Sequence, residues 1–198
     1  SLLRTLAGLQ QPLEGKIDLE PDSSIYSGHA NAIKSNLTVL ENLRFWAEIF
    51  GSEIPVDYVL EIFDLALLRD RHAGTLSAGQ QRRLGLSRLV LSNRSIWLMD
   101  EPTVALDQVA CRALSEIVRN HLNSGGCAVI ASHSEMDLTK QKKSVVVLTN
   151  NNNNNNNNGR NRKSKIVVVD KRTPRESINN IVKSKRRSRY NKNLKHLR

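Results

Sequence analysis

The sequence predicts an α/β fold built around a largely parallel sheet, because two patterns alternate along it. Short apolar runs bounded by polar residues, such as Ile96–Met99 and Ala128–Ala131, suit strands that are buried on both faces. Between them lie segments whose apolar residues recur at helical spacing, such as Gln108–Leu122. Strands that alternate with helices indicate parallel pairing. With 198 residues, of which 39% are hydrophobic, the chain suits one such domain plus a tail.

The expected elements can be placed along the chain in order. Helices are expected at Ser1–Leu9, Val39–Phe50, Val56–Leu68, Ala78–Leu91 and Gln108–Leu122. Strands are expected at Ile25–Gly28, Ile96–Met99, Ala128–Ala131 and Val145–Leu148. A turn at Pro12–Gly15 and a loop at Asp70–Ser77 interrupt this pattern.

A change of composition divides the chain into a domain, residues 1–149, and a tail, residues 150–198. Nine consecutive asparagines, Asn150–Asn158, open the tail, and such a tract builds no packed core. The tail holds 15 Lys and Arg against 2 Asp and Glu, so it accounts for the net charge of +11. We therefore expect a disordered basic tail, with Ile166–Val169 as an isolated strand at most. The folded part is not expected to bind a specific nucleic acid.

The tail has two interpretations. A basic, flexible segment can lie on an anionic membrane surface or bind RNA. Tyr190 is its only aromatic residue, whereas proteins that bind single strands stack several aromatics on the bases. An extension without a function is therefore the favoured interpretation.

Other features of the sequence bound the class of protein. Cys111 and Cys127 lie in apolar stretches and in no metal-binding spacing, so buried thiols in a reducing compartment are expected. No run approaches the roughly 20 apolar residues that span a bilayer, and the amino terminus has no signal-peptide pattern. The chain does not begin with Met, which we expect of a sequence whose start is missing.

The first segment with candidate chemistry is Leu76–Leu84, which reads LSAGQQRRL. Ser77 and Gly79 open a helix there. The first N–H groups of a helix have no helical partner, and the helix dipole is positive at that end, so the segment suits an anion such as phosphate. An ordinary helix capped by Ser77 explains the same residues, so this segment alone does not decide between the two.

The second segment is Ile96–Pro102, which reads IWLMDEP. Asp100 and Glu101 follow four apolar residues and so lie at the carboxyl end of a buried strand, where α/β sheets bind ligands. Adjacent strand residues point to opposite faces, so the two carboxylates can take different roles. Asp100 suits a Mg²⁺ ion, and Glu101 suits the water that attacks a terminal phosphate. A solvated turn is the alternative.

The third segment, Val129–His133, is a buried strand that ends on a histidine within reach of a terminal phosphate. A lone histidine after a strand is more often structural. The order of the segments strengthens the functional interpretation, because Ser77 precedes Glu101 by 24 residues and His133 follows it by 32. The triplet Ala105–Asp107, which reads ALD, lies between Glu101 and His133.

Together these segments resemble the motifs of the ATP-binding-cassette (ABC) ATPases. LSAGQQ resembles the signature motif, IWLMDEP an extended Walker B motif, ALD the D-loop, and His133 the switch histidine. Four motifs in the order and spacing of the family make coincidence improbable. The resemblance spans about residues 1–149. It implies a P-loop NTPase-like ABC ATPase domain with a helical subdomain that carries the signature motif.

The resemblance implies that two copies act together, with each ATP between the Walker motifs of one copy and the signature of the other. Ser77, Gly79 and Gln80 would then bind the ATP held by the second copy. Asp107 would communicate across this homodimer.

The resemblance also implies roles within one copy. Asp100 would serve Mg²⁺, Glu101 would be the catalytic base, and His133 would sense the terminal phosphate. ATP hydrolysis would then drive a conformational change in a membrane partner.

Two departures from the family pattern stand out. The sequence contains no P-loop motif, G-x-x-x-x-G-K-[ST], whose backbone N–H groups and lysine hold the phosphates. Ser1–Leu9 resembles the helix after that loop, so the chain as written is expected to begin just behind it and to bind ATP poorly or not at all. The family also carries a glutamine in the loop after the strand near Ile25. Gly28–Asn31 lies there instead, and His29 either substitutes for the glutamine or is a plain loop residue.

Within the family, the chain resembles the cytochrome c maturation, or haem-exporter, ATP-binding subunits. The segments Ile25–His29, Ile33–Lys34 and Leu37–Trp46 are typical of that group. The resemblance implies an ATP-hydrolysing subunit that associates with integral membrane permease subunits and supports haem delivery to c-type cytochromes. The sequence has no C-x-x-C-H pattern that would attach haem to this chain.

Two alternatives stay open. The missing P-loop motif is compatible with a non-catalytic remnant or a regulatory subunit, although Asp100, Glu101 and His133 are present. The chain could also be the ATP-binding subunit of another ABC transporter. As a transporter subunit it would lie peripherally on the inner membrane, on the cytoplasmic face in a bacterium or on the matrix face in a mitochondrion.

Overall fold

The structure is a computed structural model that describes residues 2–20, 22–133, 136, 138, 143–148 and 164–170. Ser1, the asparagine tract Asn150–Asn158 and the remainder of the basic tail lie outside these residues, so the predictions made for them stay predictions.

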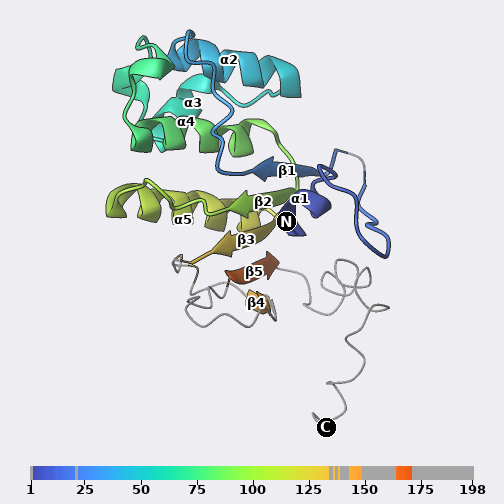
Figure 1. Ribbon diagram of the computed structural model, residues 1–198. Helices are drawn as coiled ribbons and strands as arrows, with labels where there is room; N and C mark the ends of the chain where they lie inside the picture. Colours follow the sequence, from blue (N-terminus) through green and yellow to red (C-terminus); the bar gives the residue numbers. More distant parts are fainter. Residues whose placement is uncertain are drawn as a thin grey trace, which may run out of the picture.

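One five-stranded sheet forms the centre of the molecule (Figure 1). Its order across the sheet is β1 (Ser24–Ser27), β2 (Ile96–Asp100), β3 (Cys127–Ser132), β5 (Ser164–Asp170) and β4 (Lys143–Leu148). The first three strands are parallel, whereas β5 is antiparallel to both β3 and β4. The predicted α/β fold is confirmed, and its sheet is mixed because β5 runs opposite to the other four strands.

The strand β5 corrects the expectation that residues 150–198 lack structure apart from an isolated strand. It pairs with the whole length of β3, from Cys127 opposite Asp170 to Ser132 opposite Lys165. A run of four β-branched residues, Ile166–Val169, suits a strand, and β3 would otherwise expose unpaired backbone groups at the edge of the sheet. The partner of this run lies more than thirty residues away, so local composition does not reveal it.

The helices are α1 (Leu2–Leu6), α2 (Val39–Phe50), α3 (Val56–Ile62), α4 (Ala78–Leu91) and α5 (Gln108–Asn123). Short 3₁₀ turns occupy Ala66–Leu68 and Ala73–Thr75. The predicted bounds of α2 and α4 are confirmed. Each begins with a capping box, formed by Thr38 with Glu41 in α2 and by Ser77 with Gln80 in α4.

The prediction of one helix over Val56–Leu68 is wrong. The helix α3 ends at Ile62, and Asp64 adopts a left-handed backbone conformation with φ of 51°. Aspartate tolerates this conformation better than most residues do, so the chain turns without a glycine to mark the place.

Two apolar cores cover the two faces of the parallel strands. Leu98 and Val129 pack against Leu3 and Leu6 of α1 on one face. The alternate residues of these strands, including Trp97 and Met99, belong to the main core with residues of α4 and α5. The burial expected of these strands on both faces is therefore confirmed.

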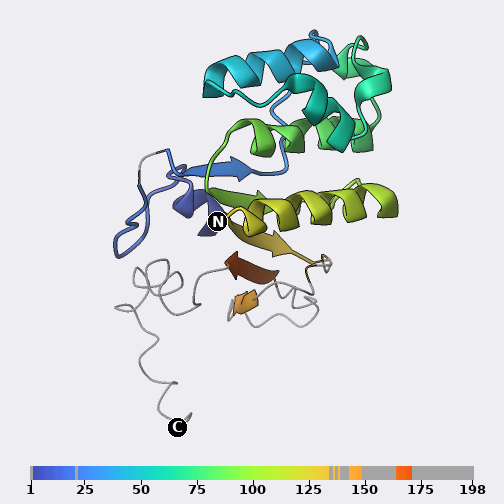
Figure 2. The same cartoon turned by 180° about the vertical axis from the view of Figure 1, so that it is seen from behind.

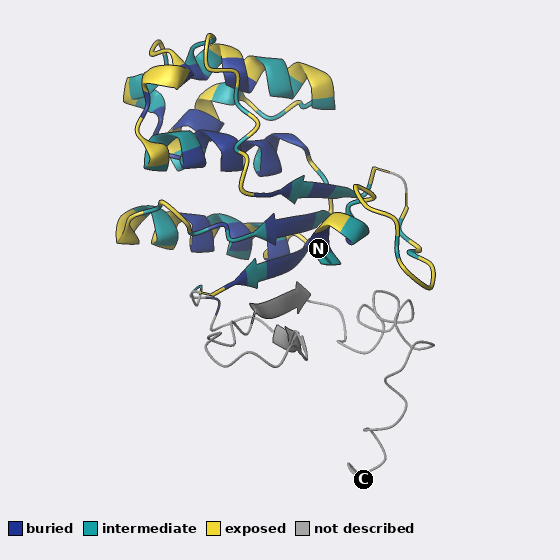
Figure 3. Cartoon of the chain, viewed as in Figure 1, coloured by how far each residue is buried: buried dark blue, intermediate teal, exposed yellow. Residues whose placement is uncertain are grey.

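The helices α2, α3 and α4 form a separate group beyond β1, and α5 runs beside β2 and β3 in both views (Figures 1 and 2). The helix α4 joins this group to the sheet and is buried along most of its length (Figure 3). Leu84, Leu86, Leu89 and Leu91 are each at most 1% exposed. Arg82 and Arg88 of the same helix are buried as well.

Two further observations concern the described residues. None of the helices described here has both the length and the apolar character needed to cross a membrane. Of the two thiols, Cys127 is buried as predicted, whereas Cys111 is partly exposed.

Candidate functional site

The carboxyl ends of β2 and β3 bring Glu101 and His133 together. The backbone N–H of His133 donates to the two carboxylate oxygens of Glu101 at 3.1 and 3.3 Å, and the Ser132 hydroxyl donates to Oε2 at 3.3 Å. The imidazole Nε2 of His133 lies 3.6 Å from Oε1 of Glu101. The side chain of Glu101 is 15% exposed and that of His133 is 50% exposed, so solvent reaches the pair mainly from the histidine side.

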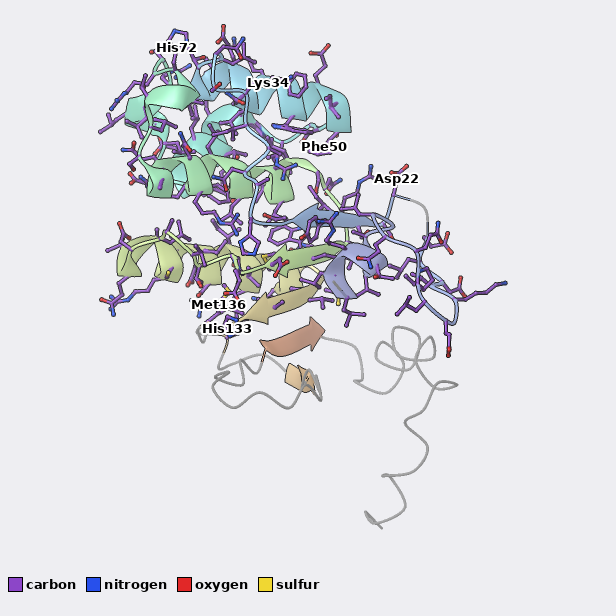
Figure 4. The ribbon with its side chains drawn as sticks, in the orientation of Figure 1. Asp22, Lys34, Phe50, His72, His133 and Met136 are labelled. Atoms are coloured by element: carbon purple, nitrogen blue, oxygen red, sulfur yellow. The ribbon has the colours of Figure 1, made fainter. Side chains whose placement is uncertain are left out.

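Figure 4 shows where this pair lies in the molecule. His133 is at the carboxyl end of β3, with Met136 beside it, whereas Asp22 marks the opposite end of the strands near the start of β1. The pair therefore occupies the edge of the sheet where α/β proteins bind ligands.

The backbone of Glu101 is held in a left-handed conformation, with φ of 48°. Its N–H donates to the carbonyl oxygen of Ala131 at 2.7 Å, which joins the end of β2 to β3. Its own carbonyl oxygen accepts from Nη2 of Arg82 at 2.9 Å. Glutamate rarely adopts this conformation, and these two contacts hold its backbone there from both sides.

Asp100 lies one residue earlier and is held by a different partner. Its Oδ2 accepts a hydrogen bond from the hydroxyl of Tyr26 at 3.3 Å, across the pair of strands β1 and β2. Burial, and then the negative charge of Asp100, raise the pKa of Tyr26 above its ordinary value. Tyr26 therefore stays a neutral donor that fixes the Asp100 carboxylate.

Arg82, in the second turn of α4, is a site residue that sequence reasoning missed. Its guanidinium contacts Gly28, Asn31, Asp100, Glu101 and Pro102, and only 4% of the residue is exposed. Burial lowers the pKa of Arg82, while the neighbouring Asp100 charge acts in the opposite direction. The sequence did contain a sign that Arg82 is buried, because Arg82 shares a helix face with Leu86 and Leu89 at positions i+4 and i+7.

The signature residues begin α4. The Ser77 hydroxyl accepts from the backbone N–H of Gln80 at 3.3 Å, and Oε1 of Gln80 accepts from the backbone N–H of Ser77 at 2.9 Å. No side chain among the described residues caps the backbone N–H groups of Ala78 and Gly79. A side chain at position 79 would collide with Ala105, since a Cβ there would lie 2.8 Å from its carbonyl oxygen.

Asp107 begins α5 as its N-cap. Its Oδ1 accepts from the backbone N–H of Ala110 at 2.7 Å, and the side chain lies at an exposed position. Burial and the charge of Asp107 raise the pKa of Cys111, so this thiol is less acidic than a free one.

The structure thus brings three of the predicted residues together and leaves the others apart. Asp100, Glu101 and His133 share the carboxyl edge of the sheet. Within the described residues, no hydrogen bond joins Ser77 or Gln80 to any of these three. The signature residues form a second patch at the start of α4, where Ser77 is exposed and Gly79 and Gln80 are partly buried.

The loop after β1 contacts the site through other residues than His29. His29 is exposed, whereas the Gly28 carbonyl and the Asn31 side chain accept from Nη1 of Arg82 at 2.6 and 3.2 Å. Whether His29 takes the place of the family glutamine stays a prediction.

The residues at this edge fit a magnesium–nucleotide complex. No three His, Cys, Asp or Glu side chains converge as a metal site in the described part of the chain. Mg²⁺ bound to a nucleotide needs no such cluster, because it takes one or two carboxylates, the phosphate oxygens and water. Asp100 offers a carboxylate of this kind at the carboxyl end of β2.

Comparison with known proteins gives a family. Residues 1–104 match the protein-family model described as ABC transporter. The chain is 52% identical over 138 residues to the cytochrome c biogenesis ATP-binding export protein CcmA of Ruegeria pomeroyi, covering 70% of this chain and 67% of that protein. It is 51% identical over 138 residues to the protein of the same name from Paracoccus denitrificans, covering 70% and 65%. The chain therefore spans about two thirds of the length of these relatives.

Solved structures share the fold. An ABC transporter ATP-binding protein from Pyrococcus furiosus superposes with a TM-score of 0.60 at 22% identity, over 69% of this chain and 73% of that one. A dimeric ATP-binding cassette in a post-hydrolysis state, bound to ADP and Pi, superposes with a TM-score of 0.57 at 22% identity, over 67% and 68%. The family match and the curated relatives agree with the motifs at the edge of the sheet. The chain belongs to the ABC transporter family of ATP-binding proteins, in the group whose curated members are the cytochrome c biogenesis ATP-binding export proteins.

Proposed function

We propose that the chain is the ATP-hydrolysing part of an ABC transporter subunit that supports haem export for cytochrome c biogenesis. The position of Glu101 is the observation that carries this proposal. Its carboxylate lies at the carboxyl end of a buried strand, next to a histidine, in a family of ATP-binding proteins.

Glu101 is the general base in this proposal. A carboxylate orients the attacking water and accepts its proton as the bond to the terminal phosphorus forms. The backbone N–H of His133 and the hydroxyl of Ser132 hold the carboxylate oxygens in place. The imidazole of His133, on the more exposed side of the pair, then contacts the terminal phosphate.

Asp100 serves Mg²⁺, directly or through water. Bound Mg²⁺ neutralises the charge that develops on the phosphate oxygens. Tyr26 donates to one carboxylate oxygen of Asp100, which leaves the other oxygen for the ion or its water. The geometry of Asp100 is thus set by a residue of the neighbouring strand.

The start of α4 binds the ATP held by a second copy. The uncapped N–H groups of Ala78 and Gly79 and the positive end of the helix dipole favour an anion there. The Ser77 hydroxyl and the Gln80 side chain now each accept from the backbone N–H of the other residue, and both can exchange these bonds for phosphate contacts. Asp107, exposed at the start of α5, communicates between the two copies.

Integral membrane permease subunits of the cytochrome c maturation system are the partners in this proposal. The chain associates with the inner membrane through them, on the cytoplasmic face in a bacterium or on the matrix face in a mitochondrion. ATP and Mg²⁺ are its ligands, and haem is handled by the whole transporter.

Replacement of the base tests the proposal. Glu101→Gln in the native full-length subunit keeps the size and hydrogen-bond geometry of the side chain but removes the proton acceptor. We expect phosphate release to fall at least about 100-fold while ATP binds with unchanged affinity, because a general base contributes about 10²–10⁴-fold. Phosphate release and equilibrium binding of labelled ATP are the measurements.

Glu116→Gln is the matched control, since Glu116 is paired with Arg119 on the outer part of α5. It is expected to hydrolyse ATP at the wild-type rate. Two results would contradict the proposal. Retained turnover in Glu101→Gln would exclude Glu101 as the base, and a wild-type protein that binds no ATP would favour a regulatory or defunct subunit.

A further inference from the structure

The conformation of Glu101 poses a physical question. A glutamate with φ of 48° is strained, because its Cβ crowds the neighbouring carbonyl. Such a conformation persists only where the surroundings fix it from more than one side. The N–H of Glu101 is fixed by Ala131 at 2.7 Å, and its carbonyl oxygen is fixed by Arg82 at 2.9 Å.

The guanidinium of Arg82 uses every donor that it has. It carries five N–H groups in a rigid plane. Nε donates to the carbonyl of Pro102 at 3.4 Å, and Nη2 donates to the carbonyls of Asp100 and Glu101 at 3.3 and 2.9 Å. Nη1 donates to the loop after β1, at the Gly28 carbonyl and the Asn31 side chain. This buried guanidinium therefore binds three successive carbonyls, those of Asp100, Glu101 and Pro102 at the end of β2. It also binds the loop after β1 and so connects that loop to the end of β2.

The approach of that loop to α4 depends on Gly85, one turn after Arg82. A Cβ at position 85 would lie 2.8 Å from the carbonyl oxygen of Asn31 and 2.9 Å from its Cα. Because position 85 has no side chain, the loop reaches the helix and the guanidinium reaches both Gly28 and Asn31.

We propose that Arg82 is a positioning residue, which holds the backbone of Glu101 in its left-handed conformation and so sets the direction of the catalytic carboxylate. This inference rests on the proposed role of Glu101 as the base. Because Arg82 belongs to α4, it also fixes the catalytic turn of one copy to the helix whose first residues face the other copy. Lysine cannot replace it, since an ammonium has three donors at one point and no planar fork.

Arg88 provides a matched control on the same helix. It is also buried, at 8% exposed, and the central carbon of its guanidinium lies over the ring of Trp46, 4.8 Å from the ring centroid. Its Nε donates to the Gly85 carbonyl at 3.2 Å, and none of its described contacts reaches the turn after β2. Arg82→Gln and Arg88→Gln each remove one buried guanidinium, but only the first removes the donors to that turn.

The experiment compares Arg82→Gln, Arg82→Lys and Arg88→Gln in the native full-length subunit. We expect Arg82→Gln to lower kcat for ATP hydrolysis about 10- to 100-fold, as a misplaced base does, with the KM for ATP changed less than about threefold. Arg82→Lys is expected to lose kcat as well, whereas Arg88→Gln is expected to keep it. An equal loss of kcat in Arg82→Gln and Arg88→Gln, or full kcat in Arg82→Lys, would overturn the proposal.

A measurement without nucleotide separates this inference from the proposed function. Hydrogen–deuterium exchange of the peptide that contains residues 98–104 reports on the Glu101 N–H, which donates to Ala131. We expect faster exchange in Arg82→Gln and Arg82→Lys than in Arg88→Gln. Unchanged exchange in both Arg82 variants would overturn the positioning role, even if the wild-type protein hydrolyses ATP. Faster exchange in these variants, together with a wild-type protein that does not hydrolyse ATP, would refute only the proposed function.

Discussion

Single residues set the close contacts around the site, and Gly85 shows this most directly. In the interior of a helix, alanine is favoured over glycine by about 1 kcal/mol. Here the added methyl group would meet backbone atoms of Asn31, which cannot rotate away as a side chain could. Overpacking of this kind costs about 1–3 kcal/mol, so it outweighs the gain in helix propensity.

We therefore expect Gly85→Ala to lower the free energy of unfolding by about 1 kcal/mol and to accelerate exchange in the turn after β2. Urea denaturation gives the first quantity. A variant more stable than the wild type would show that the loop after β1 does not need this approach.

The roles of single residues differ in how far the sequence predicts them. Ser77, Asp100, Glu101 and His133 lie within short motifs, so each could be assigned from its neighbours along the chain. Arg82 could not, because its partners come from three segments that only the folded chain brings together. Its buried position follows from the helix face, but its function follows from the contacts.

At the scale of elements, the end of α5 is attached to the start of β2 by one aromatic stack. The ring of His121 lies 3.9 Å from that of Trp97, with 7° between the planes. His121 also contacts the carbonyl oxygen of Cys127 at 3.3 Å, through Nε2. Burial is the main cause that lowers the pKa of His121 below its ordinary value of 6.5, and hydrogen bonds to backbone carbonyls oppose it.

Because of this lowered pKa, the free energy of unfolding is expected to depend on pH. Below pH 6.5 the unfolded chain binds a proton at His121 that the folded protein resists, so the contribution of His121 to stability is complete above pH 6.5 and is lost as the pH falls below it. We expect His121→Phe, which keeps an aromatic ring against Trp97, to weaken the loss of stability between pH 7.5 and pH 5. Urea denaturation at both values measures it.

His29→Gln is the control for this prediction, because His29 is exposed in the loop after β1. It is expected to keep the wild-type dependence on pH. If His121→Phe and the wild type lose stability equally on acidification, the titration of His121 does not contribute.

The elements also show where local sequence information ends. The starts of α2 and α4 were predictable because each capping box is formed by residues within a stretch of four along the sequence. The end of α3 before Asp64 was not predictable, since the chain turns there at a left-handed aspartate and not at a glycine or a proline, the residues that usually mark such a turn. The strand β5 was not either, because its pairing with β3 joins distant segments.

At the scale of the whole molecule, the two halves of the candidate site lie apart in one chain. Asp100, Glu101 and His133 share the edge of the sheet, whereas Ser77 and Gly79 begin α4. The proposed function joins them across two copies. In that proposed arrangement, an arginine at the start of α4 would place bulk and positive charge between the two copies.

We expect Ser77→Arg to prevent ATP-dependent dimerisation of the full-length Glu101→Gln subunit, which holds ATP without consuming it. Light scattering with and without ATP measures the mass. Ser124→Arg adds the same charge at an exposed position after α5 and is expected to leave dimerisation intact. Equal dimerisation in both variants would contradict a site shared between copies.

The burial of α4 on nearly all sides has a consequence for how its sequence can drift. A helix with one buried stripe accepts amino-acid substitutions on its outer face, so its variable positions recur with the helical period. The helix α4 has no such free face beyond its first turn, since its leucines, Gly85, Ser87 and two arginines are all enclosed. Most positions of α4 beyond its first turn are therefore restricted in the residues that they accept, by the apolar core on some sides and by the turn after β2 on another.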